Sequence, residues 1–488
     1  MSMFIFIIGF VAWGYWFIDP EIKFIKWLLT LVNISNNWCE KPELNDNISC
    51  GEESLFPKDK DSYFQPGQFV QSVNFFTQKR KKNQNNPEIL IYLNNAKLMQ
   101  EHRKSYTIAV IVPIKQDDQG TAKALLRGAA QIQEDFNKNT AHPGLKVIIV
   151  NDDNNPDTVP KLAENLLSKD DIVAVFGHYT SELTKEALPI YQRKKVVVIA
   201  PATASRESIL NGQKYPENFL FRITPSVKVE IPELIKQLKL AKLTNGEKVA
   251  IFYTPSSTYS KSAFEEIRNQ LGVNRIIDKD VSVPDFTAFS TLNEVKQQGA
   301  KALIFIPDGR VNPNSIKNTL SLIDVNQDQL PMGGLSVLYR TEILNRKNIV
   351  KKLLLVIYWH PLTSPNQKVI DRAKQLWGTG YINIQTAMSY DGTLVLTKVL
   401  EKLSPIDSWE KQRLNIQKQL NSLEVKEGAS GTISFDKVGD RKEDTSQPVH
   451  VVLTECNSFG AMFVPIKKQA LPCSEVQEPH PQPPPRKR

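Results

Sequence analysis

The sequence predicts an α/β protein made of two doubly wound parallel-sheet lobes with a hinge and a central cleft. An N-terminal membrane anchor and a small helical segment precede the lobes. Short apolar runs rich in β-branched residues alternate with amphipathic helical windows from Tyr106 onward, and this alternation begins again at Lys248. The runs are apolar without interruption, which is typical of parallel strands covered by helices on both faces.

The first unit is predicted from five apolar runs with helices between them. The predicted strands are residues 107–112, 146–150, 172–176, 196–199 and 219–223, and the helices lie near 121–137, near 159–167 and from Ser181. The second unit has strands at 248–253, 276–283, 302–306 and 353–357, with helices near 260–271, 289–298 and 314–322. We assign residues 105–223 plus 362–432 to lobe 1, and 224–361 plus 433–470 to lobe 2.

Composition restricts the function classes. The chain has 488 residues, a net charge of +9, 41% hydrophobic residues and 23% charged residues, as in an ordinary globular protein. The positive charge is spread out except for the run 79–82, which we interpret as a solvated helix end or loop, so no nucleic-acid partner is predicted. Four cysteines without a CxxC pair argue against a disulfide scaffold and a zinc site.

The first 35 residues favour an uncleaved membrane anchor over a buried core helix. Residues 3–18 carry no charge, and a positive n-region and a small-residue cleavage site are both missing. We therefore expect a periplasmic or otherwise extracytoplasmic protein held in the cytoplasmic membrane by this segment. Export would permit a disulfide between Cys39 and Cys50. The tail 471–488 is rich in proline and is predicted to be disordered.

Residues 36–104 read as a polar linker that contains a helical hairpin. Phe69, Val73 and Phe76 mark one helix, residues 87–96 mark another, and 79–86 are the predicted loop between them. The hairpin resembles a degenerate tetratricopeptide-type unit, which would dock a peptide. The alternative is a spacer that packs against the anchor or the main domain, because one hairpin without neighbouring repeats cannot bury a continuous core.

The search for catalytic motifs favours binding over chemistry. The six histidines are scattered, and the chain has no HExxH, GxSxG, GxxxxGK[ST] or GxGxxG motif. We predict no catalytic residue, no metal site and no cofactor. A hydrolase on this scaffold is the least favoured class, because no nucleophile–base pair is visible.

Polar loops that follow the predicted strands form the candidate site. In open α/β units, ligands bind beyond the carboxyl ends of the strands and at helix N-termini. The candidate ligand-binding residues are Tyr179, Thr180, Ser181, Ala202, Thr203, Ala204, Tyr259, Asp308 and Ser336. Hydroxyl and N–H groups of the first unit would bind an anion, opposite an aromatic ring and a carboxylate of the second, a division that suits a zwitterion. The alternative is that these residues only cap helices and turns.

Several motifs, in this order, resemble a known family. They are residues 151–156, 175–178 with 190–191, 200–205, 221–226, 389–392 and 428–440. Over about 105–465 the chain resembles the type I solute-binding proteins of ABC transporters, in the branched-chain amino-acid-binding group. The resemblance implies two lobes joined by three hinge strands that close on a small ligand. It also implies that Ser181, Ala202 and Thr203 hold a ligand carboxylate, while Tyr259 covers it from the second lobe.

The sequence departs from the amino-acid-binding pattern at several positions. Leu335-Ser336 stands where those members have an acidic residue, with Asp308 as a substitute, and Ala204 stands where a threonine is expected. These departures predict a ligand other than a simple aliphatic amino acid. The preferred hypothesis is a solute-binding protein for a small, carboxylate-bearing ligand, with ABC permease subunits as partners. The alternative is a membrane-anchored partner-binding regulator with a degenerate cleft.

Overall fold

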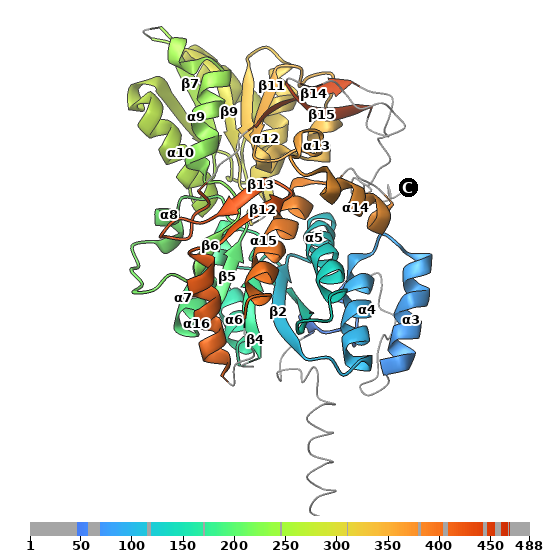
Figure 1. The fold of residues 1–488 in the computed structure, drawn as a ribbon. Coiled ribbons are helices and arrows are strands. Elements are labelled where there is room, and N and C mark those ends of the chain that lie inside the picture. Colours follow the sequence, from blue (N-terminus) through green and yellow to red (C-terminus); the bar gives the residue numbers. More distant parts are fainter. Residues whose placement is uncertain are drawn as a thin grey trace, which may run out of the picture.

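The described residues form one large sheet in each of two lobes and a small two-stranded sheet between them (Figure 1). The computed structural model describes residues 46–56, 69–114, 119–168, 171–244, 246–309, 311–378, 382–403, 408–442, 447–453, 460–466 and 468. The predicted anchor (1–35) and tail (471–488) lie outside the described residues. Within those residues, no helix combines the length and apolar character needed to cross a bilayer.

The first sheet has six strands in the order β1-β3-β2-β4-β5-β6, and all neighbours are parallel except β1 with β3. The strands are β1 (Ile48–Ser49), β2 (Ser105–Val112), β3 (Gly144–Asn151), β4 (Ile172–Phe176), β5 (Val197–Ala200) and β6 (Leu220–Arg222). The helices of this lobe are α5 (Gly120–Asn137), α6 (Val159–Leu166), α7 (Ser181–Arg193), α8 (Arg206–Leu210), α14 (Gln367–Trp377), α15 (Ile384–Leu400) and α16 (Trp409–Leu420). Because helices cover both faces, β2 to β6 are almost completely buried.

The second sheet has seven strands in the order β15-β14-β11-β10-β9-β7-β8. They are β7 (Lys248–Tyr253), β8 (Ile276–Asp280), β9 (Ala300–Ile306), β10 (Met332–Leu335), β11 (Leu353–Ile357), β14 (Gln447–Leu453) and β15 (Ala461–Pro465). The helices are α9 (Val227–Gln237), α10 (Thr258–Leu271), α11 (Ala288–Gln297), α12 (Pro313–Asn326) and α13 (Thr341–Leu344). Short 3₁₀ turns occur at Leu240–Lys242, Val273–Arg275, Ser336–Leu338 and Pro361–Thr363. The doubly wound parallel fold is thus confirmed, and antiparallel β14 and β15 are added at one edge.

The segment around Gly333 and Gly334, which is not among the strands predicted from the sequence, is strand β10 in the middle of the second sheet. A Cβ atom on Gly333 would lie 2.4 Å from Leu238 Cδ1, and one on Gly334 would lie 2.6 Å from Leu338 Cδ1. The two glycines are therefore explained by close packing of neighbouring side chains on both faces of the strand.

Three segments join the two sheets. The first follows β6 and leads into α9, the second leads from β11 to α14, and the third leads from β13 to β14. A small hairpin, β12 (Glu424–Gly428) with β13 (Gly431–Ser434), lies between the lobes next to these connections (Figure 1). The exact lobe boundaries given above stay a prediction.

The helical pair exists and belongs to the first lobe. Helices α3 (Phe69–Lys82) and α4 (Pro87–Gln100) pack together, and α4 packs against α5 and β3 (Figure 1). The predicted loop 79–86 is wrong in its first half, because α3 continues through Lys82. The basic run forms the last turn of α3, as one of its two interpretations expected, but Arg80 is not simply solvated. Its guanidinium lies 4.8 Å from the centre of the Trp377 ring and donates to the carbonyl of Leu376.

Asn95 of α4 acts as a substitute for a neighbouring strand at the edge of β3. Its side-chain oxygen accepts from Val147 N at 3.1 Å, and its amide nitrogen donates to Val147 O at 2.8 Å. The same amide nitrogen also contacts the carbonyl of Cys50, which is buried and disulfide-bonded, with its partner cysteine outside the described residues. Residues 46–56 and α4 are thereby attached to the sheet.

We expect Asn95→Ala to lower the free energy of unfolding by about 2–4 kcal/mol, because two buried backbone groups of Val147 lose their partner. Asn94→Ala is the matched control. Asn94 is also buried in α4, but its amide nitrogen has no hydrogen-bond partner among the described residues. Urea unfolding followed by circular dichroism measures both variants. Equal losses would contradict the role given to Asn95.

Candidate functional site

The N-termini of two helices from different lobes meet at a carboxylate. Helix α7 begins after Thr180, whose Oγ1 accepts from Leu183 N at 3.5 Å, and α10 begins after Ser257, whose Oγ accepts from Ser260 N at 3.2 Å. Glu182 Oε1, in the first turn of α7, accepts from Ser257 Oγ at 2.6 Å and from Tyr259 N at 3.2 Å. The lobes are therefore in direct contact through an anion placed at the positive end of α10.

The surroundings of Glu182 are unfavourable to a second negative charge. Burial raises the pKa of Glu182, and the nearby Asp308 carboxylate raises it further, while the hydrogen bonds from Ser257 and Tyr259 lower it. A ligand carboxylate placed against Glu182 would meet the same repulsion. A cationic group there would be attracted by both carboxylates.

Ser181 contacts the loop that carries Ala202, Thr203 and Ala204. Ala204 N donates to Ser181 Oγ at 3.2 Å, and the adjacent Ser205 N donates to Ser262 Oγ of α10 at 2.8 Å. Ala202 and Ala204 are buried, whereas Thr203 is partly exposed. Thr180 serves as the cap of α7 and also contacts Asn154 Oδ1 at 3.4 Å.

A second part of the site consists of the rings of Tyr179, Tyr259 and Tyr358 and the buried side chain of Glu230. Tyr259 packs against the apolar cores of both lobes, and its hydroxyl is buried without a hydrogen-bond partner among the described residues. Burial and then the Glu230 carboxylate raise the pKa of Tyr259, and burial, Tyr179 and Glu230 raise the pKa of Tyr358. Tyr179 Oη accepts from Gln385 Nε2 at 3.1 Å. These four residues therefore lie close together.

Asp308 and Ser336 lie in the second lobe near this group. Asp308 N donates to Ser315 Oγ at 2.8 Å, and the Asp308 carboxylate accepts from Asn312 N in its own loop. Asp308 thus holds the backbone of Asn312, the residue that caps α12, and adds negative charge near Glu182. The Ser336 side chain is hydrogen-bonded to Tyr358. The site roles given to all nine candidates from the sequence stay predictions.

Sequence reasoning missed Glu182, Glu230 and Tyr358. Glu182 and Glu230 stand in the first turns of α7 and α9, where acidic residues are common because they favour the helix dipole, so neither differs from an ordinary helix start. Tyr358 directly follows the apolar run of β11, and the signal that could have found it is that position at a strand's carboxyl end.

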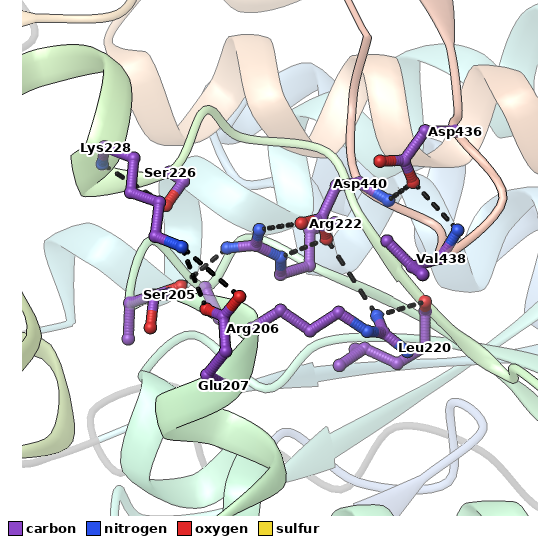
Figure 2. A network of polar contacts seen from close by, with 12 residues as sticks. Ser205, Arg206, Glu207, Leu220, Arg222, Ser226, Lys228, Asp436, Val438 and Asp440 are labelled. Atoms are coloured by element: carbon purple, nitrogen blue, oxygen red, sulfur yellow. Dashed lines mark hydrogen bonds and ion pairs between the residues drawn. The ribbon is translucent and has the colours of Figure 1, made fainter. Parts of the chain in front are cut away.

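The loop that carries Ala202 to Ala204 is connected to the hinge by ionic contacts. Figure 2 shows Arg222, at the end of β6, with Nε 2.7 Å from Asp440 Oδ1 and Nη2 2.5 Å from Asp440 Oδ2. Arg206 Nη1 lies 3.9 Å from the same carboxylate, and Lys228 pairs with Glu207 at the surface. Arg222 and Asp440 come from two different connections between the lobes.

A second hinge cluster surrounds Asp391 of α15, which is completely buried. Its carboxylate accepts from Ala429 N at 2.5 Å and from Ser430 N at 3.1 Å, and Arg441 Nη1 lies 4.0 Å away. Trp359 Nε1 donates to Ala429 O at 2.9 Å, and Arg441 Nη1 donates to Ile223 O at 3.2 Å. All three connections therefore meet at the β12–β13 turn.

One pocket of about 440 Å³ lies beside α12 in the second lobe. Its lining includes Lys317, Arg340 and Arg346, and none of the nine candidate site residues lines it. In the part of the chain that the structure describes, no group of three acidic, histidine or cysteine residues is placed to hold a metal ion.

Comparison with known proteins identifies the family of the two-lobed region. A family model described as "Periplasmic binding protein" matches residues 105–454, more than half of the chain, and confirms the resemblance predicted from the motifs. A curated relative, an amino acid binding protein of Pseudomonas aeruginosa, is 25% identical over 186 residues, which are 37% of this chain and 47% of that protein. The chain thus spans about half the length of the curated relative it matches.

Solved structures share the fold. A leucine-binding protein from Thermotoga maritima superposes with a TM-score of 0.59 at 18% identity, over 73% of this chain and 97% of that chain. A solute-binding protein of an ABC transporter from Rhodopseudomonas palustris, in complex with p-hydroxybenzoic acid, gives 0.60 at 16% identity, over 72% and 94%. The family and these neighbours are binding proteins, as the prediction of a non-enzymatic function expected.

The Asp391 cluster gives a prediction about pH. Burial raises the pKa of Asp391 to about 6, and Arg441 opposes the rise only in part. Asp391 is therefore ionised less readily in the folded protein than in the unfolded chain, so its contribution to stability is lost as pH rises from about 4 to above 6. The free energy of unfolding of the wild type minus that of Asp391→Asn should therefore fall by up to about 3 kcal/mol as the pH rises over this range. Urea unfolding at pH 4.5, 6 and 8 measures it, and a difference independent of pH would contradict the raised pKa.

Proposed function

Because the chain belongs to the periplasmic binding protein family, we propose that it is the solute-binding component of an ABC-type uptake system and captures a small ligand between its two lobes. The observation that carries this proposal is the meeting of Ser181, Ala204, Glu182 and Tyr259 from both lobes at the ends of α7 and α10. Family membership favours an extracytoplasmic location, with the anchor in 1–35 and ABC permease subunits as partners.

We propose that the ligand carries both a carboxylate and a cationic group. The relatives support the first part, since solved structures with this fold hold leucine, isoleucine and p-hydroxybenzoic acid as their ligands. Loop 202–204 and Ser181 would hold the carboxylate, as the resemblance implies. Glu182 and Glu230 would supply negative charge beside Asp308, the substitute predicted from the sequence. The rings of Tyr179, Tyr259 and Tyr358 suit an ammonium group or an apolar ligand body.

Closure over the ligand would exchange contacts between the lobes. In the present arrangement the donors at the start of α10 bind Glu182, so the lobes are joined without a ligand. A cation that binds Glu182 would compete with these donors for its carboxylate. Ligand binding would thus change the balance between open and closed forms through its different affinity for each of them.

The test combines native mass spectrometry of the gently purified full chain with isothermal titration. The titrated probes are leucine, ornithine and 4-hydroxybenzoate, which differ in charge. We expect ornithine to bind and Glu182→Gln to weaken that binding at least tenfold, because an amide keeps the hydrogen bonds but loses the charge. Ser181→Ala should weaken binding of every carboxylate probe.

The matched control is Ser256→Ala, because Ser256 is exposed in the same loop as Ser257. Its affinities should equal those of the wild type. Absence of any co-purified small molecule, together with no heat of binding for all three probes in a folded sample, would reject the proposed function. Those results would favour the alternative, a partner-binding regulator whose lobes stay joined through Glu182.

A further inference from the structure

The candidate ligand loop, residues 201–205, is held by the first connection between the lobes. Thr224 Oγ1 donates to Ala202 O at 3.2 Å, and Val227 N donates to Thr203 O at 2.9 Å. Arg222 Nη1 donates to Ala204 O at 2.6 Å. Three successive carbonyls of the loop thus bind one short segment, 222–227, which leaves the first sheet and enters α9 of the second lobe.

The N–H side of the same loop faces the helix ends of the site. Ala204 N donates to Ser181 Oγ, and Ser205 N donates to Ser262 Oγ of α10. The orientation of each peptide group fixes its carbonyl and the following N–H in opposite directions. A donor that holds the carbonyl of Ala204 therefore also sets the direction in which Ser205 N points.

Arg222 is the residue that connects this loop to a second connection. It is 2% exposed, and its guanidinium uses Nε and Nη2 for the carboxylate of Asp440 and Nη1 for Ala204 O (Figure 2). Its backbone N also donates to Gly439 O at 2.8 Å. Asp440 is fixed in turn, because its backbone N donates to Asp436 Oδ1 at 2.8 Å.

We propose that Arg222 is a positioning residue for the loop 201–205 and that Asp440, which does not touch the loop, is its anchor on the third connection. A rotation of the lobes that shifts the third connection relative to the first moves the guanidinium, and with it the carbonyl of Ala204. Hinge geometry is thereby transmitted to the donors of the site. The inference rests on the proposed function only where it takes 201–205 as a ligand-binding loop.

The planar guanidinium is suited to this task. Its nitrogens donate in fixed directions, so two can bind one carboxylate while a third binds a carbonyl on the other side. A lysine ammonium would keep the charge beside Asp440 but could not hold both groups in one plane. Arg222→Lys therefore separates the positioning role from the ion pair.

Hydrogen–deuterium exchange of the full chain, followed by mass spectrometry, tests the proposal without any ligand. We expect Asp440→Asn to accelerate exchange of the amides of residues 202–205 at least tenfold, although Asp440 contacts none of them. Arg222→Lys should accelerate the same amides. Peptides from β2 and β7, which each pair with a strand on both sides, should exchange as in the wild type.

The matched control is Lys228→Gln. Lys228 lies in the same network but is exposed, and its ammonium pairs with Glu207 at the surface (Figure 2). Its loop amides should exchange at the wild-type rate. Unchanged exchange at 202–205 in both Asp440→Asn and Arg222→Lys would overturn the proposal. So would equal acceleration in β2, β7 and the loop, because that pattern reports a general loss of stability.

Failure of this experiment and failure of the proposed function are distinguishable. Exchange rates report the coupling between Asp440 and the loop whether or not a solute binds. If ornithine or leucine binds while the loop amides do not respond, the ligand site stands and Arg222 has no positioning role. If the loop responds but no probe binds, the coupling stands and the solute-binding function fails.

Discussion

The two-lobed arrangement depends on buried arginines that must find partners. Arg222 and Arg441 are both nearly inaccessible to water, and a guanidinium cannot be neutralised by losing its proton. Arg222 binds the Asp440 carboxylate and the carbonyl of Ala204. Arg441 lies near Asp391 and donates to the carbonyls of Ile223, Ser430 and Thr432. Leaving either buried cation without partners would cost free energy. The three connections between the lobes, which are distant in sequence, are therefore held next to one another.

Outside the hinge, a carboxyl group takes part in the contact between the lobes. Glu182 extends from the first lobe to the donors at the start of α10, so the contact between the lobes is polar and directional at this point. Burial and the neighbouring Asp308 make this arrangement less favourable for an ionised Glu182 than contact with a cation would be. The site is therefore held together by a group that a positively charged solute would stabilise, which links closure to the chemistry of the bound molecule.

Most of the fold could be predicted, and the errors have physical causes. Strands such as β4 and β9 are visible because both faces of a parallel sheet are buried, which removes polar residues from the run. Strand β10 was hidden by Gly333 and Gly334, which the sequence presents as a turn but which the packing requires as small residues. Antiparallel β14 and β15 lie at an edge, where the pattern is weaker.

The site was predicted less completely than the fold. Ser181 and Ala204 were found because they follow strands, and the structure brings them together. Glu182 and Glu230 were not found, because a carboxylate in the first turn of a helix is already explained by its favourable interaction with the helix dipole. Asp308 was considered free to meet a ligand, yet it accepts a hydrogen bond from its own loop. Which carboxylates converge depends on the lobe contacts, and these are not encoded in any local pattern.

The bonding of Asn95 to Val147 bears on where the unit truly begins. The family match starts at residue 105, but β3 is completed by β1 and by an amide from α4, both of which precede that residue. A chain shortened to the matched region would expose β3 as an edge strand. Its unpaired N–H and C=O groups could then form hydrogen bonds with a strand of another molecule. Strand β1 and helix α4 thus cover an edge that could otherwise pair with another chain, which makes residues 46–56 and 69–104 part of the folding unit rather than a tether outside it.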